Sequence, residues 1–307
     1  MRNLLIVGLG DVARRALPYL VRHWRVLAVT RSPQAARIAR AGGALPVSAN
    51  LDDWKSLQRV AGLAIDDVLI TAPPPENGRT DPRMRKLLSA MTKADSIPQR
   101  LCYISTTGVY GDGGGEWLDE TSPLRPQSDR AQRRADAEAA LRAFSRRHGV
   151  QLTILRTPGI YAADRLPLRR LLDGLPLIRP EEDSFSNHIH ADDLARLCVA
   201  GLLRVNGGLR CYNACDDEPL SVTDWYSQLA DCFLLPLPEM LPREEVKQRV
   251  SPGLWSFLAE SRRVDNTRLR RELKAVLRYP TVRVLLEELS ADAGLRAEIL
   301  AKAGKIR

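Results

Sequence analysis

The sequence has 307 residues, of which 44% are hydrophobic, and its formal net charge is +9 at pH 7. Such a chain is typical of a globular protein with one large or two smaller cores, and it holds no run of the roughly 18 apolar residues that a membrane span requires. Because the arginines are scattered, without a basic stripe of interleaved aromatic residues, the charge favours small anionic ligands over nucleic acid.

The first half of the chain alternates between strand-like and helix-like segments. Strands are expected at 3–7, 25–30, 44–49, 66–72, 100–106 and 150–156, and helices at 11–24, 33–42, 51–62, 79–94 and 127–148. The strands are apolar throughout, which indicates a parallel sheet with helices on both faces. A helix at 190–204 and a strand at 209–214 are expected to return to this sheet.

We therefore expect an α/β fold: a Rossmann-like, doubly wound parallel sheet with a smaller C-terminal substrate-binding domain. Residues 1–156 and 187–215 would form the dinucleotide-binding domain, and residues 157–186 and 216–307 the smaller substrate or cap domain. The ligand would lie in the crevice at the carboxyl ends of the strands.

Five cysteines occur without a Cys-x-x-Cys pair, which argues against a zinc site or a disulfide framework and suits a reducing compartment. The opening MRNLLIVGLG has an apolar stretch of only about five residues, too short for a signal peptide. We expect a cytoplasmic protein that does not insert into a membrane.

A phosphate-binding turn is the most specific local signal. Gly8-Leu9-Gly10-Asp11-Val12-Ala13 fits G-x-G-x-x-A, directly follows a strand and opens a helix. The first glycine permits the tight turn, the second lets the backbone approach a pyrophosphate, and the alanine allows close packing of helix on sheet. The phosphates would then meet the free N–H groups at the positive end of the helix dipole.

The end of the second strand indicates which dinucleotide binds. An acid that would hold the ribose 2′-hydroxyl of NAD is missing there, and Arg31 and Ser32 stand in its place. A guanidinium matches a phosphate, so we expect NADP, with NAD as the alternative if Arg31 is only a surface residue. Ala72 and Pro73 follow the fourth strand, where a cofactor would pass, and are further candidate contacts.

Several segments, taken together and in order, carry a resemblance to a known family. They are GLGDVA (8–13), YISTTGVYGD (103–112), LDETSPLRP (118–126), LRTPGIYAADR (155–165), HIHADDLA (188–195), YNACDDEPLS (212–221) and VDNTRLRREL (264–273). The chain resembles the extended short-chain dehydrogenase/reductase family, the NAD-dependent epimerase/dehydratase group, and is most similar to its atypical YeeZ-like branch. This resemblance implies a nucleotide sugar or another small carbonyl or hydroxyl compound as substrate, and a homodimer formed through the helices at 79–94 and 127–148.

The family's chemistry uses a Ser or Thr together with a Tyr and a Lys four residues apart on one helix. Thr106 matches the hydroxyl position. If Glu138 is the Glu that often follows the Lys, the Tyr and Lys positions hold Arg130 and Arg134. Arginine does not release its proton in proteins, so Arg130 cannot replace a tyrosinate, whereas Arg134 could still bind ribose hydroxyls.

Other interpretations of these segments stay open. Residues 127–138 could be a plain solvated helix face, with Arg133 paired to Asp129 and Asp136. Tyr110 is a candidate proton donor but is more typical of a packing residue, as is Tyr161. His188 and His190 share a face of an extended segment, but a third ligand would have to come from Asp192 or Asp193, and those acids are expected to cap the next helix, so no metal is expected.

Two classes of function fit this sequence. The first is an NADP-dependent oxidoreductase or epimerase whose proton donor is Thr106, Tyr110 or a bound water. The second is a protein that binds NADP(H) and senses its redox state without turnover, which the replacement of the Tyr and Lys pair by arginines favours.

Overall fold

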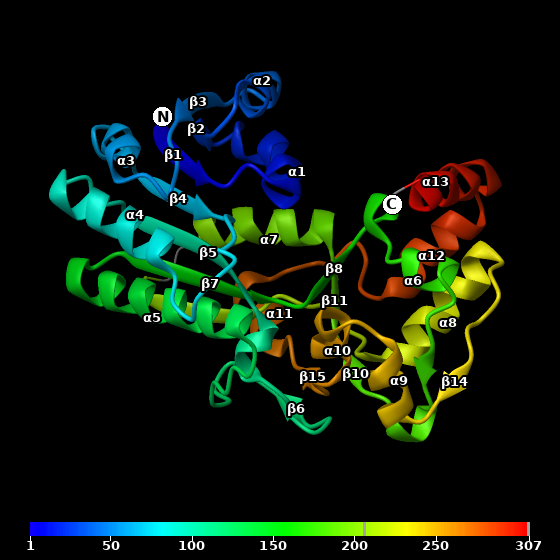
Figure 1. Cartoon of the computed structure of the whole chain (residues 1–307). Helices are drawn as coiled ribbons and strands as arrows, with labels where there is room; N and C mark the ends of the chain where they lie inside the picture. The colour runs from blue at the N-terminus through cyan, green and yellow to red at the C-terminus, as the bar shows by residue number, and fades with distance from the viewer. Residues whose placement is uncertain (205–206, 306–307) are drawn as a thin grey trace.

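The larger lobe is built on a seven-stranded sheet whose observed strand pairs are all parallel. The computed structural model describes residues 1–204 and 207–305 (Figure 1). The strand order is β12-β7-β5-β4-β1-β2-β3. The strands are β1 (Arg2–Val7), β2 (Trp24–Thr30), β3 (Leu45–Ser48), β4 (Asp67–Ile70), β5 (Arg100–Thr106), β7 (Gln151–Thr157) and β12 (Leu209–Asn213). The chain runs outward from β1 to β3 and then crosses to β4 on the other side of β1, so the strand order reverses between β1 and β4.

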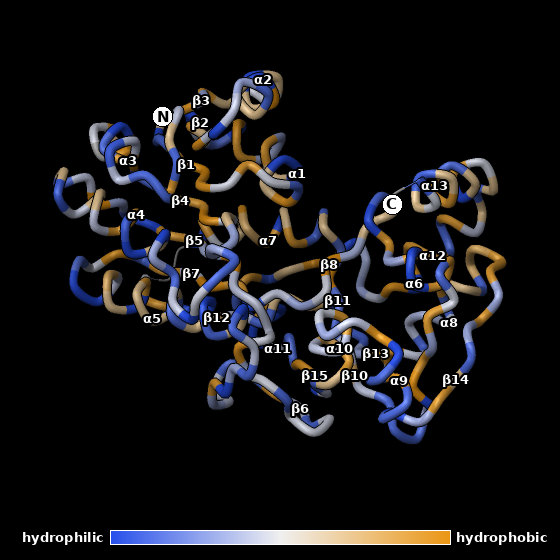
Figure 2. Tube along the Cα trace, in the orientation of Figure 1, coloured by the Kyte–Doolittle hydropathy of each residue, from blue (hydrophilic) through white to orange (hydrophobic). Residues whose placement is uncertain are grey.

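Helices cover both faces of this sheet. They are α1 (Asp11–Leu20), α2 (Pro33–Ala41), α3 (Trp54–Ala61), α4 (Pro82–Lys93), α5 (Asp129–His148) and α7 (Ala191–Leu203). One hydrophobic cluster joins α1, α2 and α7 to one face, and a second joins α3, α4 and α5 to the other. Figure 2 shows hydrophobic residues along the central strands and along α7. The predicted Rossmann-like fold is confirmed.

Three predicted helices differ from the observed ones by a few residues at one end, and in two of them the reason is an N-cap. The helix expected from residue 51 begins at Trp54, because the Asp53 carboxylate accepts the N–H groups of Lys55 and Ser56. The helix expected from 79 begins at Pro82, because Asp81 accepts the N–H group of Met84. The helix expected to reach residue 24 ends at Leu20, and Trp24 starts β2 instead.

A third hydrophobic cluster lies in the smaller lobe, drawn in green and from yellow to red in Figure 1. Its helices are α6 (Arg169–Leu172), α8 (Val222–Phe233), α9 (Arg243–Arg249), α10 (Pro252–Leu258), α12 (Val282–Ser290) and α13 (Ala293–Lys305). Short strand pairs accompany them: β8 (Gly159–Tyr161) with β11 (His188–His190), β9 (Leu177–Ile178) with β14 (Met240–Leu241), β10 (Phe185–Ser186) with β13 (Leu220–Ser221), and β6 (Trp117–Leu118) with β15 (Arg263–Val264).

One late segment returns to the larger lobe. Helix α11 (Thr267–Leu273) contributes Leu269 to the hydrophobic cluster that joins α1, α2 and α7 to the sheet, and Leu277 belongs to the same cluster. This stretch therefore does not belong to the smaller lobe's core, although the sequence assigned it to the cap domain. The exact division into two domains and the homodimer remain predictions. Within the described ranges no helix is both long and apolar enough to cross a membrane.

Candidate functional site

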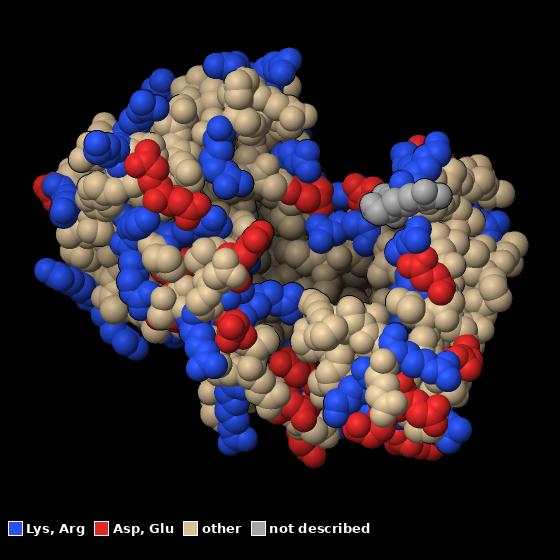
Figure 3. Space-filling model, in the orientation of Figure 1, with Lys and Arg blue, Asp and Glu red and all other residues tan. Residues whose placement is uncertain are grey.

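Two cavities open along one edge of the sheet. Because the strands are parallel, all their carboxyl ends lie at this edge. The first cavity, about 580 Å³, lies at the ends of β1 to β4; we call it the turn cavity. The second, about 310 Å³, lies at the ends of β5 and β7; we call it the arginine cavity. Figure 3 shows that the molecule is hollowed between its two lobes, with Lys and Arg side chains at the rim.

The glycine turn forms one wall of the turn cavity. The residues predicted from the sequence that line this cavity are Gly8, Gly10, Arg31, Ser32, Ala72 and Pro73. Gly8 has a φ of 100°, and a Cβ atom there would lie 2.5 Å from the backbone nitrogen of Ala72. A Cβ on Gly10 would have nothing within 4 Å. The first glycine is thus required by the turn, and the second leaves open space beside the cavity.

The start of α1 is suited to receive an anion. Gly10 is its N-cap and no side chain caps the helix, so the backbone N–H groups of its first turn are not covered by a cap. Asp11 turns its carboxylate to Arg15 and Arg165, at 2.9 and 2.8 Å. Burial alone would raise the pKa of Asp11, but the hydrogen bonds from Arg165 and Arg15 lower it overall. The two guanidinium groups thereby offset a charge that would otherwise repel a phosphate.

Three residues of the turn do not line the cavity with their side chains. Val12 and Ala13 are buried in the core, and Asp11 forms its ion pairs away from the lining. The sequence predicted these residues as part of the cofactor-binding turn through the free N–H groups of the helix start, and their side chains are not placed to touch a ligand there. Only the backbone N–H groups of these residues can serve that role.

Arg31 is an exposed cation at the end of β2. It forms no hydrogen bond or ion pair with any residue that the structure describes, and it lines the turn cavity. The neighbouring Ser32 caps α2 by accepting the N–H group of Ala35 at 3.2 Å. Arg83 also lines this cavity and was missed from the sequence; the Asp52 carboxylate holds it through two hydrogen bonds of 2.7 Å.

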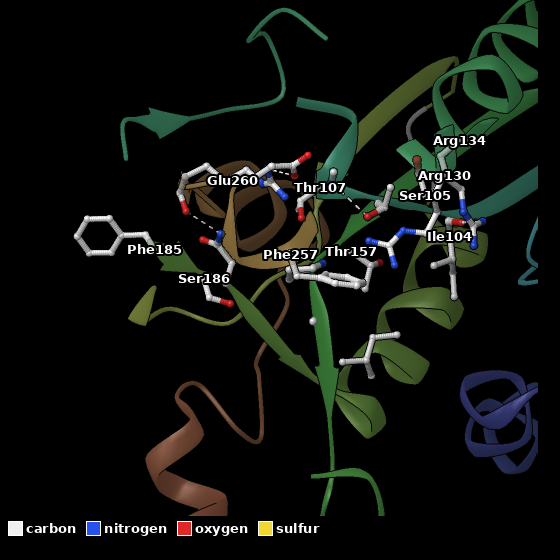
Figure 4. Close-up of a pocket in the computed structure, with 17 residues that line it drawn as sticks. Ile104, Ser105, Thr107, Arg130, Arg134, Thr157, Phe185, Ser186, Phe257 and Glu260 are labelled. Carbon is white, nitrogen blue, oxygen red and sulfur yellow. Dashed lines mark hydrogen bonds and ion pairs between the residues drawn. The ribbon is translucent and has the colours of Figure 1, made fainter. Parts of the chain in front are cut away.

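The arginine cavity brings together three of the predicted site residues. Thr106, Arg130 and Arg134 all line it. Figure 4 labels the two arginines at the cavity. The Thr106 hydroxyl accepts the N–H group of Gly108 at 3.2 Å, at the start of the short 3-10 helix η1 (Thr107–Tyr110). Arg134 donates to the carbonyl oxygen of Ile104 at 2.8 Å. These contacts fix the hydroxyl and one guanidinium beside the end of β5.

Arg130 is held differently from Arg134. Its guanidinium carbon lies 4.1 Å from the centre of the Phe257 ring, and it has no hydrogen-bond partner among the described residues. Packing against its surroundings lowers the pKa of Arg130, and Glu260 raises it. The side chain remains fully charged at neutral pH.

Two functional candidates in this cavity come from the other lobe and were missed from the sequence. Arg262 and Glu260 line the cavity, and they bind each other at 2.6 Å. Glu260 is the one carboxylate among the cavity's described lining residues, against three arginines. The cavity is therefore electropositive and suited to an anionic ligand. The only local signal was the Arg262-Arg263 pair directly before the family-like segment 264–273.

Tyr110 does not line the arginine cavity, contrary to its candidacy as a proton donor. It is 2% exposed, donates its hydroxyl to Asn213 at 2.7 Å and accepts from Arg156 at 2.9 Å. Burial raises the pKa of Tyr110 despite the Arg156 guanidinium. It is a core residue, because the turn into η1 directs its ring inward.

The opening of α5 is more than a solvated face. Arg133, expected in a surface pair with Asp129 and Asp136, is buried and donates to the carbonyl oxygen of Gly78 at 2.6 Å. Asp136 binds Arg85 instead, at 2.5 Å. Glu138 is buried as well, so the helix directs charged side chains inward on two sides.

Both central histidines are buried, and their helix is capped in an unexpected way. His190, not Asp192 or Asp193, caps α7 by accepting the N–H group of Asp192 at 3.2 Å. Asp193 accepts the N–H groups of Arg278 and Tyr279, at 2.9 and 2.8 Å. No group of three or more His, Cys, Asp or Glu side chains suited to a metal ion occurs in the part of the chain that the structure describes.

Comparison with known proteins identifies the family. The model of the NAD dependent epimerase/dehydratase family matches residues 4–215. The chain belongs to this family. A comparison with curated proteins finds no match.

Solved structures share the fold over nearly the whole chain. A conserved protein of unknown function from Silicibacter pomeroyi is 32% identical, with a TM-score of 0.78 and coverage of 96% of this chain and 100% of the other. UDP-glucose 4-epimerase from Thermotoga maritima, solved with UDP-glucose, is 17% identical, with a TM-score of 0.75 and coverage of 99% and 100%. MoeE5 in complex with UDP-glucose and NAD is 19% identical, with a TM-score of 0.71 and coverage of 99% and 100%.

Proposed function

We propose that this family member is an NAD(P)-dependent oxidoreductase or epimerase that acts on an anionic substrate with a carbonyl or hydroxyl group. A nucleotide sugar is the first candidate, since two structurally similar proteins were solved with UDP-glucose. The observation that carries the proposal is the arrangement of the two cavities. They lie along one sheet edge, at the ends of β1 to β4 and of β5 and β7, with the glycine turn in one and Thr106 and three arginines in the other.

The turn cavity would hold the dinucleotide. The N–H groups at the start of α1 would bind the pyrophosphate, and the open space at Gly10 leaves room for it. Arg31 and Ser32 would bind the additional phosphate of NADP, and Ala72 and Pro73 would flank the cofactor where it passes β4. We propose NADP as the preferred cofactor because Arg31 forms no ion pair among the described residues, while Asp52, the acid that feels its charge, is bound to Arg83.

The arginine cavity would bind the reacting end of the substrate. When bound, the nicotinamide cofactor supplies the hydride transfer. The Thr106 hydroxyl would orient the substrate oxygen, and Arg134 would bind ribose hydroxyls. Arg130 would stabilise negative charge that develops on that oxygen, since it is a permanent cation that cannot give up its proton. The proton would be exchanged by Glu260 or by a water that Thr106 holds.

The second candidate is an NADP(H)-binding redox sensor without turnover. It is favoured by the substitution of Arg130 and Arg134 for the family's Tyr and Lys, because neither guanidinium can act as a proton shuttle. Both candidates share the same cofactor site and differ only in whether the arginine cavity performs chemistry.

Turnover decides between them. Purified protein is mixed with NADPH or NADP and with UDP-glucose, other sugar nucleotides and aldehydes, while the absorbance of the reduced cofactor is followed. Because epimerisation returns the hydride, product sugars are also separated by chromatography. For an enzyme, Thr106→Ala should lower kcat by about a hundredfold or more, and Glu260→Gln should do the same where Glu260, and not a water, exchanges the proton. The exposed Thr121→Ala serves as a control and should retain full activity.

Each result has a distinct meaning. Tight binding of NADPH without conversion of any substrate would support the sensor. Equal rates for the wild type, Thr106→Ala and Glu260→Gln would rule out the roles given to these two residues. Failure of both NADPH and NADH to bind at millimolar concentration would overturn both candidates.

A further inference from the structure

A third cavity, of about 320 Å³, lies on the side of the smaller lobe; we call it the aromatic cavity. It shares Gly159, Ile160, Ser186 and Phe257 with the arginine cavity, so the two are neighbours with common walls. A molecule whose reacting end occupies the arginine cavity can therefore extend into the aromatic cavity.

Aromatic rings form much of the wall of this cavity. Tyr161, Trp225, Tyr226 and Phe257 line it, and the His188 ring lies 4.8 Å from that of Trp225, centre to centre. Such walls favour a planar, largely apolar body, because stacked or edge-to-face rings attract each other beyond the gain from burial. The lining alone does not indicate charge.

Arg170, on α6, supplies the charge. It is 5% exposed and lines the cavity, and its guanidinium carbon lies 4.7 Å from the centre of the Tyr226 ring. One nitrogen, Nη2, donates to the carbonyl oxygen of Pro176 at 2.6 Å. The other two, Nε and Nη1, are buried without a hydrogen-bond partner. The Asp183 carboxylate and the Tyr226 hydroxyl both act on the charge of this side chain, but no carboxylate among the described residues lies within ion-pair distance of it.

A buried guanidinium without a counter-ion is costly unless something else compensates its charge. Burial lowers the pKa of Arg170, although the Tyr226 hydroxyl and, to a smaller extent, the Asp183 carboxylate oppose this shift. Arg165, the other arginine that lines the cavity, already pairs with Asp11 at 2.8 Å. Arg170 is thus the arginine of this cavity that forms no ion pair among the described residues, and two of its nitrogens, Nε and Nη1, have no acceptor there.

We propose that the aromatic cavity binds the far end of the substrate and that Arg170 receives an oxyanion there, carried on a planar ring. This inference rests on the proposed function and deepens it: the substrate is an anionic compound with a carbonyl or hydroxyl group at one end and a ring bearing a phosphate or carboxylate near the other. The oxyanion accepts a hydrogen bond from Nε or from Nη1, which point to different sides of the guanidinium, and the ring packs against Trp225 and Phe257.

Binding of small probes tests this inference without any turnover. Calorimetry measures phenyl phosphate, benzoate and the neutral benzyl alcohol on the full-length protein. Phenyl phosphate or benzoate should bind, and Arg170→Met should raise the Kd of that probe about tenfold or more, the loss expected for a charge-assisted hydrogen bond. The phosphate and carboxylate probes distinguish the two sources of the oxyanion. Binding of benzyl alcohol should be unchanged by the same substitution.

Matched variants keep the test independent of folding. Arg169→Met removes an exposed arginine from the same helix, one that pairs with Asp173, and should leave the Kd of the probes unchanged. Leu254→Trp should fill the cavity and abolish probe binding with Arg170 intact. If Arg170→Met does not fold, as judged by its NADPH affinity and melting curve, Arg170→Lys replaces it and should lose affinity because the fork of N–H donors is gone.

Two results would overturn the inference: neither anionic probe binds at millimolar concentration, or each binds equally to the wild type and to Arg170→Met or Arg170→Lys. Neither result depends on catalysis. A protein that binds NADPH and turns over sugar nucleotides but ignores these probes would refute the inference and leave the proposed function standing. A protein that binds the probes through Arg170 but converts no substrate would support the anion site at Arg170 and refute the proposed enzyme activity.

Discussion

At the scale of single residues, the arginine cavity offers two guanidinium groups, Arg130 and Arg134, at the positions that the family resemblance assigns to Tyr and Lys. Arg134 is fixed by the carbonyl oxygen of Ile104 and by the Tyr103 hydroxyl, at 2.8 and 3.1 Å, while Arg130 rests on Phe257. A tyrosine and lysine at these places could pass a proton, but two guanidinium groups can only bind, orient and neutralise. The question of turnover therefore depends on whether Glu260 or a water takes over proton exchange.

Arg31 offers a prediction at the same scale. Arg31→Ala should raise the Kd for NADPH about ten- to a hundredfold, because it removes charge-assisted hydrogen bonds to the additional phosphate, and should leave the Kd for NADH nearly unchanged. Arg37→Ala, on the exposed side of α2 and outside the turn cavity, is the matched control. Equal weakening of both dinucleotides by Arg31→Ala would show that Arg31 does not select the phosphate.

At the scale of elements, α5 is tied to the sheet by a buried charge network. Glu138 accepts hydrogen bonds from Ser105 at 2.6 Å and from Arg156 at 2.9 and 3.2 Å. Arg156 also donates to Tyr110, which continues the network to Asn213 on β12. These bonds join β5, α5, β7 and β12 just behind the arginine cavity, one helical turn beyond Arg134. The same network explains why Tyr110 is a core residue.

Breaking this network should be costly. Glu138→Gln leaves the Arg156 guanidinium buried without a counter-charge, so it should lower the free energy of unfolding by about 3–5 kcal/mol, measured by urea denaturation. Arg142→Ala removes the more exposed partner of Glu138, at 3.5 Å, and should cost less than about 1 kcal/mol. A small loss for Glu138→Gln would mean that the buried pair does not anchor α5.

At the scale of the whole molecule, two features join the lobes. Arg15 on α1 binds Asp164 and Asp192 at 2.6 and 2.8 Å, while Arg165 binds Asp11, so the segment after β8 is held against the start of α1. Next to it, β8 pairs with β11, and the ring of His188 on β11 packs against Trp225 of α8. We call the segment after β8 together with the β8–β11 pair the junction. A ligand at α1 and a ligand in the aromatic cavity would both contact the junction.

The junction should be sensitive to acid. Burial lowers the pKa of His188 to about 4, from an ordinary value of 6.5. Between these two pH values the unfolded chain binds a proton that the folded chain does not, so stability falls as the pH falls through this range. The loss attributable to His188 should approach about 3 kcal/mol.

Thermal melting between pH 7.5 and 4.5 measures this effect. His188→Gln should show a shallower decrease of Tm with acidification than the wild type, because its side chain does not titrate. His23→Gln, which changes an exposed histidine, should retain the slope of the wild type. Identical slopes for His188→Gln and the wild type would show that His188 does not govern the acid response.

The sequence by itself determined the alternation of strands and helices in the first half of the chain and the glycine turn, and it placed Arg31 at the end of the second strand. The assignment of the family's Tyr and Lys positions to Arg130 and Arg134 also comes from the sequence and stays a prediction. These features are local: apolar periodicity, turn chemistry and residue type depend on neighbours in the chain. The helix boundaries moved by a few residues where Asp53 and Asp81 cap, which is also a local effect that periodicity alone does not resolve.

Only the tertiary structure decided which side chains face a cavity. Tyr110 and Arg133 turn inward, whereas Glu260 and Arg262 reach the end of β5 from the other lobe, more than a hundred residues later in the chain. Arg170 resembled any other surface arginine in the sequence until folding buried it without an acid. Such placements follow from packing and charge pairing between distant segments, and no periodicity within one segment records them.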